Sequence, residues 1–329
     1  MMSEALARPG FVRVAKRWRP DVRQLLTNYG AVLLLVLFFI FLSVTQTSAF
    51  FTGSNLENIV EQQAEVTLLA LAETLVMITA GIDLSVGAVV ALSGLVAAHF
   101  AQLPGGGAVI PLLIAPALGA GIGLVQATII VYARIQPFLV TLAGLSIIGA
   151  LALIYSNGGP IGGLNSTFNA LGQGSVLGVP CPILVIVVVG ILLHYILRHS
   201  AVGRHIYAVG GGEETAVKIG VNVKRIKLAL YTATGLLAGL GGAVLTARVN
   251  GADPLAGSTD ELTAIAAAVI GGTSLFGGVG TIPGTFIGVL LLGVLNNGLD
   301  IINVSAYFQQ IAIGAVLLIA VVLRRWHRE

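Results

Sequence analysis

Apolar stretches long enough to cross a bilayer recur along nearly the whole chain, and they restrict what it can fold into. A transmembrane helix needs roughly 20 mostly apolar residues, and about ten stretches approach that length. With 56% hydrophobic and only 9% charged residues, the chain lacks the polar surface that a soluble protein of 329 residues would need. The sequence therefore predicts an all-α, polytopic transmembrane helix bundle. The stretches centre on residues 30–49, 60–80, 84–103, 108–132, 137–156, 181–198, 228–248, 261–276, 283–300 and 305–323.

Basic residues are distributed so unevenly that they predict the orientation of the chain. Of the 17 Lys and Arg residues, six lie near the N-terminus, seven near 134 and at 198–227, and three in the C-terminal tail. Cytoplasmic loops carry an excess of Lys and Arg. With ten spans and the N-terminus inside, every basic residue except Arg248 faces the cytoplasm. An odd number of spans would move the tail outside, so we expect ten spans with both termini cytoplasmic.

The chain divides into a basic N-terminal arm, residues 1–28, and a single membrane domain, residues 29–329. We expect the arm to be cytoplasmic and to lie against anionic membrane lipid. The net charge of +3 gives no indication of nucleic-acid binding. The stretches that flank Asp83, and the stretch 277–280, are also compatible with short or re-entrant segments.

The sequence gives no sign of catalytic or metal-binding chemistry. It has no Gly-Lys pair, so a P-loop for ATP is excluded, and it has no His-Glu-x-x-His pattern. The five His residues are scattered, and the one cysteine, Cys181, excludes an internal disulfide and a multi-cysteine metal site. We therefore expect no enzyme activity, no catalytic residue, no metal site and no cofactor in this chain.

A few polar residues lie in stretches that are otherwise apolar. The candidates for a translocation path or gate are Glu73, Asp83, Asn296 and Asn297. Polar groups at membrane depth are costly, and they usually face protein or a water-filled path. No lysine or arginine at membrane depth can neutralise Glu73, although a satisfied hydrogen bond between helices is an alternative for each residue.

Asp83 lies in the heptapeptide "GIDLSVG", at the predicted inner end of the second span. Gly81 can adopt a left-handed or tight-turn conformation that ends a helix. Asp83 can then cap a new helix that starts near Leu84, where its charge suits the helix dipole. We interpret the segment as a joint between two helices, with Gly87 permitting close packing. A contact with substrate or with a gate is the alternative for Asp83.

Two loops are candidate sites at which other proteins could bind. In the inner loop, "GGEETAVKIGVN" predicts a short helix with Glu213 and Glu214 in its first turn, Lys218 in its last and Gly220 as a stop. Such a helix is too short to be stable alone, so we expect a partner to order it. The outer loop "NGADPLAGSTDE" contains Asp253, Asp260 and Glu261, which could dock an outer partner or simply be exposed.

Four segments of the chain resemble the permease subunits of bacterial ABC importers of the ribose type. Together they extend from about residue 55 to the end of the chain. They are "GIDLSVGAVVALSG" (81–94), "GRHIYAVGGGEETAVKIGVNVKRIK" (203–227), "ELTAIAAAVIGGTSLFGGVGTIPGTFIGVLLLGVLNNGL" (261–299) and "VSAYFQQIAIGAVLLIAVV" (304–322).

The resemblance implies a complex in the bacterial cytoplasmic (inner) membrane that imports a monosaccharide, a ribose-like pentose or a hexose. It implies a second permease subunit, identical or a paralogue, and an extracytoplasmic sugar-binding protein. It also implies a cytoplasmic ABC ATPase with two nucleotide-binding domains, which would hold the ATP and Mg. The resemblance makes the loop 199–227 the ATPase coupling loop. Its candidate residues are Gly203, Arg204, Gly210, Glu213, Glu214, Ala216, Lys218 and Gly220.

Two other functional classes remain open at this point. A secondary sugar transporter, driven by an ion gradient, usually needs carboxylates or unwound ion sites near the midplane, and Glu73 is the good candidate carboxylate here. A structural or assembly factor would transport nothing. Uptake into vesicles distinguishes the three classes by its need for ATP and a binding protein, for an ion gradient, or for neither.

The charge distribution makes a direct prediction about topology. Single cysteines introduced at Ser166 and at Thr215 should react from opposite sides of the membrane in right-side-out cells. The unmodified chain, which contains only Cys181, gives the background. Labelling of both positions from outside would contradict the ten-span arrangement.

Overall fold

The computed structural model describes residues 22–103 and 107–325, and most of these are helical. Most of the predicted arm, residues 1–21, lies outside the described residues. The helices are α1 (Val22–Thr45), α2 (Thr47–Phe50), α3 (Gly53–Gln62), α4 (Ala64–Ile78), α5 (Val86–Gln102), α6 (Val109–Tyr132), α7 (Pro137–Ser156), α8 (Ser166–Gln173), α9 (Cys181–His199), α10 (Ala201–Gly211), α11 (Glu213–Lys218), α12 (Val223–Val249), α13 (Asp260–Ile270), α14 (Ile282–Ile301) and α15 (Ala306–Arg325).

Sheet structure in the described ranges is limited to two short antiparallel pairs. β1 (Ile161–Gly162) pairs with β4 (Gly251–Ala252), and β2 (Ser175–Val176) pairs with β3 (Val179–Pro180). The first pair joins the segment after α7 to the segment after α12. These strands connect helix ends and form no separate layer, so the predicted all-α class is confirmed.

The predicted spans correspond to helices of unequal length. Within the described ranges, α6, α7, α9, α12 and α14 are the five helices long and apolar enough to cross a membrane. The predicted stretch 60–80 is divided between α3 and α4, and the stretch 84–103 becomes helical only at Val86. In the stretch 261–276 the helix α13, which has 11 residues, ends already at Ile270, and residues 277–280 lie in the loop that follows it. These helices form a membrane bundle, while the count of ten spans remains a prediction.

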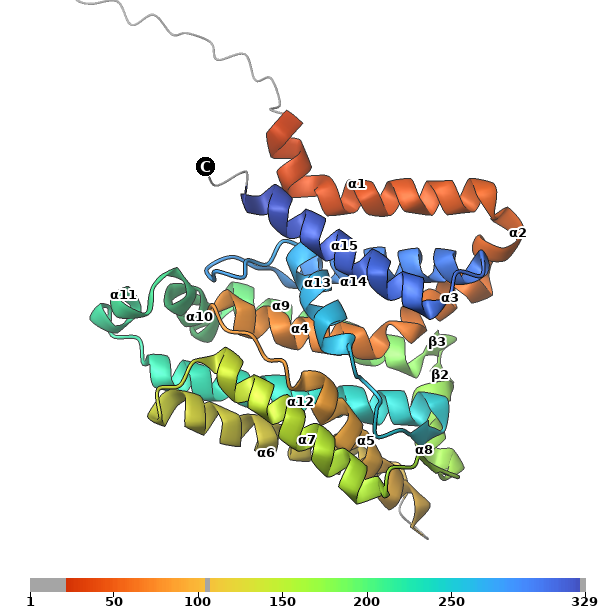
Figure 1. Ribbon diagram of the computed structural model, residues 1–329, viewed down its shortest axis with the longest axis horizontal. Helices are drawn as coiled ribbons and strands as arrows, with labels where there is room; N and C mark the ends of the chain where they lie inside the picture. Colours follow the sequence, from red (N-terminus) through yellow and green to blue (C-terminus); the bar gives the residue numbers. More distant parts are fainter. Residues whose placement is uncertain (1–21, 104–106, 326–329) are drawn as a thin grey trace, which may run out of the picture.

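Helix α12 packs in the middle of the bundle, against α4, α5 and α6 (Figure 1). Its crossing with α6 depends on glycines. A Cβ atom on Gly119 would collide with the backbone carbonyl of Gly235, and a Cβ on Gly235 would collide with that of Gly119. Gly123 and Gly239 make similar approaches further along the two helices. Small residues let helix backbones touch where burial in lipid offers little driving force, which explains the glycine-rich sequence.

Helices α4–α7 and α12–α15 form two sets with the same packing pattern. In the first set α5 packs on α6 and α7, and in the second set α13 packs on α14 and α15. Across the sets, α4 packs on α13 and α14, just as α12 packs on α5 and α6. Figure 1 shows that α4 and α12 run in opposite directions. The bundle is therefore an inverted internal repeat, an arrangement that many membrane transporters share.

In both sets, the second helix follows a stretch of non-helical backbone. Residues 79–85 precede α5, and residues 250–259 precede α13. The two helix starts meet, because a Cβ on Gly257 would lie 2.7 Å from the Gly87 carbonyl oxygen. Non-helical backbone is tolerated at membrane depth only where protein or a cavity surrounds it. These two breaks therefore mark the centre of the fold as the place to look for a site.

The α6–α12 crossing predicts a difference between two glycine substitutions. Gly235→Ala should lower the thermal unfolding temperature of the purified protein in detergent, because overpacking a tight contact costs about 1–3 kcal/mol. Gly121→Ala on α6 is the matched control, since a Cβ there meets nothing within 4 Å. Equal unfolding temperatures for the two variants would contradict the proposed close crossing.

Candidate translocation and coupling sites

The end of α4 is closed by two backbone hydrogen bonds of the Schellman type. Ala80 N–H donates to Met77 O at 2.9 Å, and Gly81 N–H donates to Val76 O at 3.1 Å. The left-handed residue is Ala80, with φ of 59°, so of the two conformations expected for Gly81 the left-handed one is wrong. Gly81 is required for space, because a Cβ there would collide with the Tyr231 hydroxyl and the Val76 side chain.

Asp83 organises the turn that leads into α5, although it does not cap the helix. Helix α5 begins at Val86, later than predicted, and its N-cap residue is Ser85. Asp83 Oδ1 accepts hydrogen bonds from the Ser85 N–H at 3.0 Å and from the Ser85 hydroxyl at 2.6 Å. The prediction of a cap on a helix starting near Leu84 is therefore corrected to a side-chain turn that holds residues 83–85.

Hydrogen bonds attach this joint to the two following helices. Gln126 of α6 donates from Nε2 to the Ser85 hydroxyl at 2.9 Å. Thr141 of α7 donates to the Ile82 carbonyl at 3.3 Å. Each of these polar side chains is buried. The joint 79–85 is thus held from α4, α6 and α7 together, so a shift of the joint would be felt by the whole first set of helices.

Glu73 and Asp83, predicted separately from the sequence, lie together at the joint. The Asp83 N–H donates to Glu73 Oε2 at 3.4 Å, and both side chains are fully buried. Glu73 Oε1 and the Tyr231 hydroxyl have no hydrogen-bond partner among the described residues. The charged groups that act on Glu73 are Asp83 and Glu261, both acidic. Buried acids without a basic partner are costly in a membrane. Glu73 and Asp83 are therefore stronger candidates for the translocation path than Asn296 and Asn297.

Asn296 and Asn297 lie apart from that pair. Asn297 exchanges two hydrogen bonds of 2.9 Å with Asn55 of α3, which makes it a satisfied link between helices. Asn296 is half-buried, and its Oδ1 has no partner among the described residues. The alternative interpretation, an interhelical hydrogen bond, therefore fits Asn297, and a path role stays a prediction for both residues.

The three acids predicted for docking occupy different environments. Asp253 is exposed, and its Oδ1 accepts from the Leu255 N–H at 2.8 Å. Glu261 is buried at the start of α13, where it faces Gly87. Asp260 is partly buried at the first turn of α13, and its charge acts on the carboxyl of Glu65 on α4. A docking role stays a prediction for all three residues, and Asp253 is the one with a freely exposed side chain.

The sequence did not indicate the charged cluster of Glu65, Asp260 and Arg248, in which Asp260 acts on Glu65 through its charge. Arg248, in the last turn of α12, acts on Glu65 through its charge. The cluster thus joins α4, α12 and α13 at the end of the bundle away from α11. Arg248 was already exceptional as the one basic residue predicted outside, and that signal could have led to the cluster. A cavity of about 210 Å³ lies near it, between α5, α12 and the segment 250–256, and its lining is mostly apolar.

The coupling loop is built from α10 and α11. Ser200 caps α10 by accepting from the Gly203 N–H at 3.0 Å. Gly212, with φ of 152°, then turns the chain into α11. As predicted, Glu213 and Glu214 lie in the first turn of α11 and Lys218 in its last. Gly220, with φ of 87°, ends it, so its prediction as a stop is confirmed.

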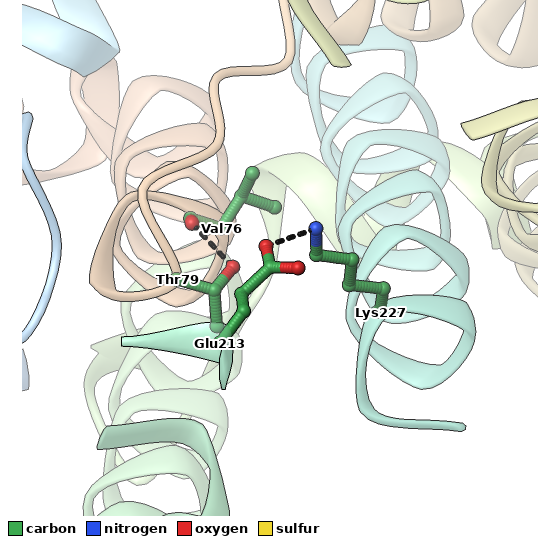
Figure 2. A network of polar contacts seen from close by, with 4 residues as sticks. All are labelled: Val76, Thr79, Glu213 and Lys227. Carbon is green, nitrogen blue, oxygen red and sulfur yellow. Dashed lines mark hydrogen bonds and ion pairs between the residues drawn. The ribbon is translucent and has the colours of Figure 1, made fainter. Parts of the chain in front are cut away.

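Helix α11 is held by its own chain, and the expectation that only a partner could order it is wrong. Ala216 is 1% exposed and packs in a cluster with Val209, Val221 and Ile226. The Val221 N–H closes the helix by donating to Ala216 O at 2.9 Å. Figure 2 shows the ion pair between Glu213 and Lys227 of α12, beside the end of α4.

Two apolar side chains, Val217 on α11 and Ile219 just after it, are exposed among the charged residues of this segment. Val217 is 60% exposed and Ile219 is 68% exposed. Arg204, Glu214 and Lys218 are also exposed, whereas Gly203, Gly210 and Ala216 pack toward the bundle. A partner would therefore meet Val217 and Ile219 before it met Ala216.

A family model described as "Branched-chain amino acid transport system / permease component" matches residues 55–321 of this chain. The matched region starts in α3 and includes the joint 79–85, both sets of the internal repeat and the coupling loop. The chain belongs to this permease family.

Several relatives of the permease are named as sugar-transport permeases. It is 42% identical to the ribose import permease protein of Escherichia coli (strain K12) over 303 residues, 91% of this chain and 94% of the relative. It is 41% identical to the ribose import permease protein of Bacillus subtilis (strain 168), over 90% of this chain and 92% of that protein. The D-allose transport system permease protein of Escherichia coli (strain K12) is 35% identical, with 91% of each chain covered. No solved structure matches the permease.

The turn at Asp83 predicts how two substitutions will differ. Asp83→Asn keeps an oxygen that can accept from Ser85, so folded protein and transport should be retained. Asp83→Ala leaves the buried Ser85 N–H and hydroxyl without this acceptor and should cost about 1–3 kcal/mol of stability, measured by thermal unfolding in detergent. Loss of transport in Asp83→Asn at normal expression would show that the charge itself is needed, which would contradict a purely structural role.

Proposed function

We propose that this chain is the transmembrane permease subunit of an ATP-driven ABC importer for a monosaccharide, a ribose-like pentose or a hexose. The observation that carries the proposal is the 42% identity to a ribose import permease over 91% of the chain. A neutral sugar needs hydroxyl and amide partners, and buried Ser, Thr and Gln side chains are present around the joint 79–85. The proposed substrate class includes the ribose, allose and arabinose types that name the relatives.

The proposed assembly places the chain in the bacterial inner membrane with about ten spans and both termini in the cytoplasm. Two permease subunits, two nucleotide-binding domains and an extracytoplasmic sugar-binding protein complete the importer. The exposed apolar residues on α6, α7 and α9 suit contact with lipid or with the second permease. ATP and Mg belong to the ATPase, because this chain has no P-loop.

In the proposed mechanism this chain makes and breaks no covalent bond. The binding protein delivers the sugar to the outer ends of the helices. Closure of the ATPase domains on ATP moves α11, whose exposed Val217 and Ile219 offer an apolar contact. The permease helices then change between outward-open and inward-open arrangements, and release requires that the path bind sugar weakly.

The alternative, an ion-gradient-driven sugar transporter, is favoured by one observation, the buried pair Glu73 and Asp83. Ion-coupled transporters commonly place carboxylates beside broken helices, as this joint does. Family membership favours the ATP-driven mechanism, and the two make opposite predictions about the energy source.

Reconstitution into liposomes tests the proposal. The permease, its ATPase and its binding protein are reconstituted together, with radiolabelled ribose, allose and arabinose offered separately. Uptake of one of these sugars should require internal-face ATP and the binding protein, and it should persist after proton and sodium gradients are collapsed. Uptake that needs only a gradient would establish the alternative instead.

Substitutions at two exposed apolar residues, one on α11 and one just after it, test the proposed ATPase contact. Val217→Glu and Ile219→Glu should weaken co-purification of the ATPase by about tenfold or more, because a charge replaces an apolar side chain at an interface. Membrane insertion should be normal, since both side chains are exposed. Leu177→Glu, at a fully exposed leucine in the turn between β2 and β3, is the control. If ATPase binding and uptake survive both α11 substitutions, this surface is not the contact.

A further inference from the structure

Three segments that are distant in sequence meet at Gly210, near the end of α10. We call this contact the Gly210 junction, formed by Ile78, Ala80, Gly210, Gly277 and Gly278. The Gly278 N–H donates to the Ile78 carbonyl at 2.8 Å. Gly210 lies directly over this hydrogen bond, because a Cβ on Gly210 would collide with Ile78 O and would lie 2.6 Å from Gly278 N. A Cβ on Gly277 would in turn lie 2.8 Å from Gly210 O and 3.1 Å from Ala80 N.

The second link of α10 to the same region is a side chain. The Tyr207 hydroxyl donates to the Gly280 carbonyl at 2.7 Å. Burial raises the pKa of the Tyr207 phenol above its ordinary value, more than the nearby Arg198 lowers it, so the hydroxyl stays a donor at neutral pH. Tyr207 and Gly210 lie one helical turn apart, so α10 is attached to the loop 271–281 at two points.

The loop 271–281 is itself a defined structure and can transmit a displacement. Its central part is closed by a hydrogen bond from the Ser274 N–H to Val279 O at 2.9 Å. Gly277 and Gly278 have φ of 83° and 75°, a conformation that favours glycine. The loop leads directly into α14, just as the other side of the junction, Ile78 and Ala80, leads through the joint 79–85 into α5.

We propose that the Gly210 junction is the transmission point at which movement of the coupling helix α11 reaches both halves of the internal repeat together. The proposal rests on the proposed importer function. It makes Gly210 and Tyr207 positioning residues inside the permease, rather than part of the surface that touches the ATPase.

The geometry explains why one movement would reach both halves. Helix α11 follows α10 after the single residue Gly212, so a displacement of α11 is carried into α10. At the junction the backbones are in direct contact, with no side chain between them to absorb the displacement by changing rotamer. Packed contacts of this kind shift as units. The carbonyl of Ile78 and the N–H of Gly278 belong to different halves, and α10 lies against both.

A pair of adjacent glycines supplies the test. Gly210→Ala inserts a methyl group into the junction, whereas Gly211→Ala is a matched control, because a Cβ at Gly211 meets nothing within 4 Å. Both variants are reconstituted with the ATPase and binding protein, and four quantities are measured: membrane insertion, ATPase association, basal ATP hydrolysis and sugar taken up per ATP hydrolysed. Tyr207→Phe removes the hydrogen bond to Gly280 while keeping the ring, with the exposed Tyr195→Phe as its control.

The expected result is a separation of binding from coupling. Gly210→Ala should retain ATPase association and basal hydrolysis, but it should lose stimulation by the sugar-loaded binding protein. Its uptake per ATP should fall about tenfold or more, within the usual range of coupling between sites. Tyr207→Phe should also retain ATPase association and lose uptake per ATP, but by a smaller factor. If Gly210→Ala fails to insert into the membrane, Tyr207→Phe alone tests the inference.

Two results would overturn the inference. If Gly210→Ala and Tyr207→Phe take up as much sugar per ATP hydrolysed as their controls, the junction does not transmit the movement of α11. Loss of ATPase association in Tyr207→Phe or in well-inserted Gly210→Ala would place these residues at the ATPase contact instead. The wild-type complex is measured first, and absence of ATP-dependent uptake there would reject the proposed function itself.

Discussion

Every break in a helix within a membrane bundle leaves backbone N–H and C=O groups that lipid cannot satisfy. This permease has such a break in each half of its repeat, and its architecture follows from satisfying them with protein. Gly81 N–H turns back to Val76, Ser85 N–H binds the Asp83 carboxyl, and Gly278 N–H binds the last carbonyl of α4, Ile78. The glycine-rich crossings around α12 then bring the helices close enough to enclose both breaks.

The all-α class could be predicted from the lengths of the apolar stretches, whereas the orientation indicated by the basic residues stays a prediction. The conformation of the first break, residues 79–85, could not be predicted, because several small free-energy contributions compete there. A left-handed alanine costs only about 1–2 kcal/mol. Tyr231 needs the space beside Gly81, and packing therefore assigns the strained position to Ala80. Propensity alone favours the glycine, and no single-sequence pattern reveals the tyrosine on a helix far along the chain.

At the candidate sites too, the sequence predicted single residues, but it did not predict which of them lie together. The sequence identified Glu73 and Asp83 individually by their cost in a membrane, but their contact arises only because the chain turns at Ala80. It placed Asp260 and Glu261 in an outer loop, whereas the segment 250–259 folds inward and places them at the start of α13. For α11, charges predicted the helix and its ends correctly. Two turns carry too little pattern to indicate which apolar side faces the bundle, and the packing of Ala216 decides it.

Helix α4 connects these observations, because every one of its residues from Ala64 to Ile78 is buried. Glu65 at one end is acted on by the charge of Asp260, and Glu73 near the other end accepts from the Asp83 N–H of the joint. Both side chains are buried in this arrangement. Access along α4 therefore requires displacement of the helices packed on it, and the contact of α10 with Ile78 and Gly278 is where a force from the coupling loop would reach the segments that lead into α5 and α14.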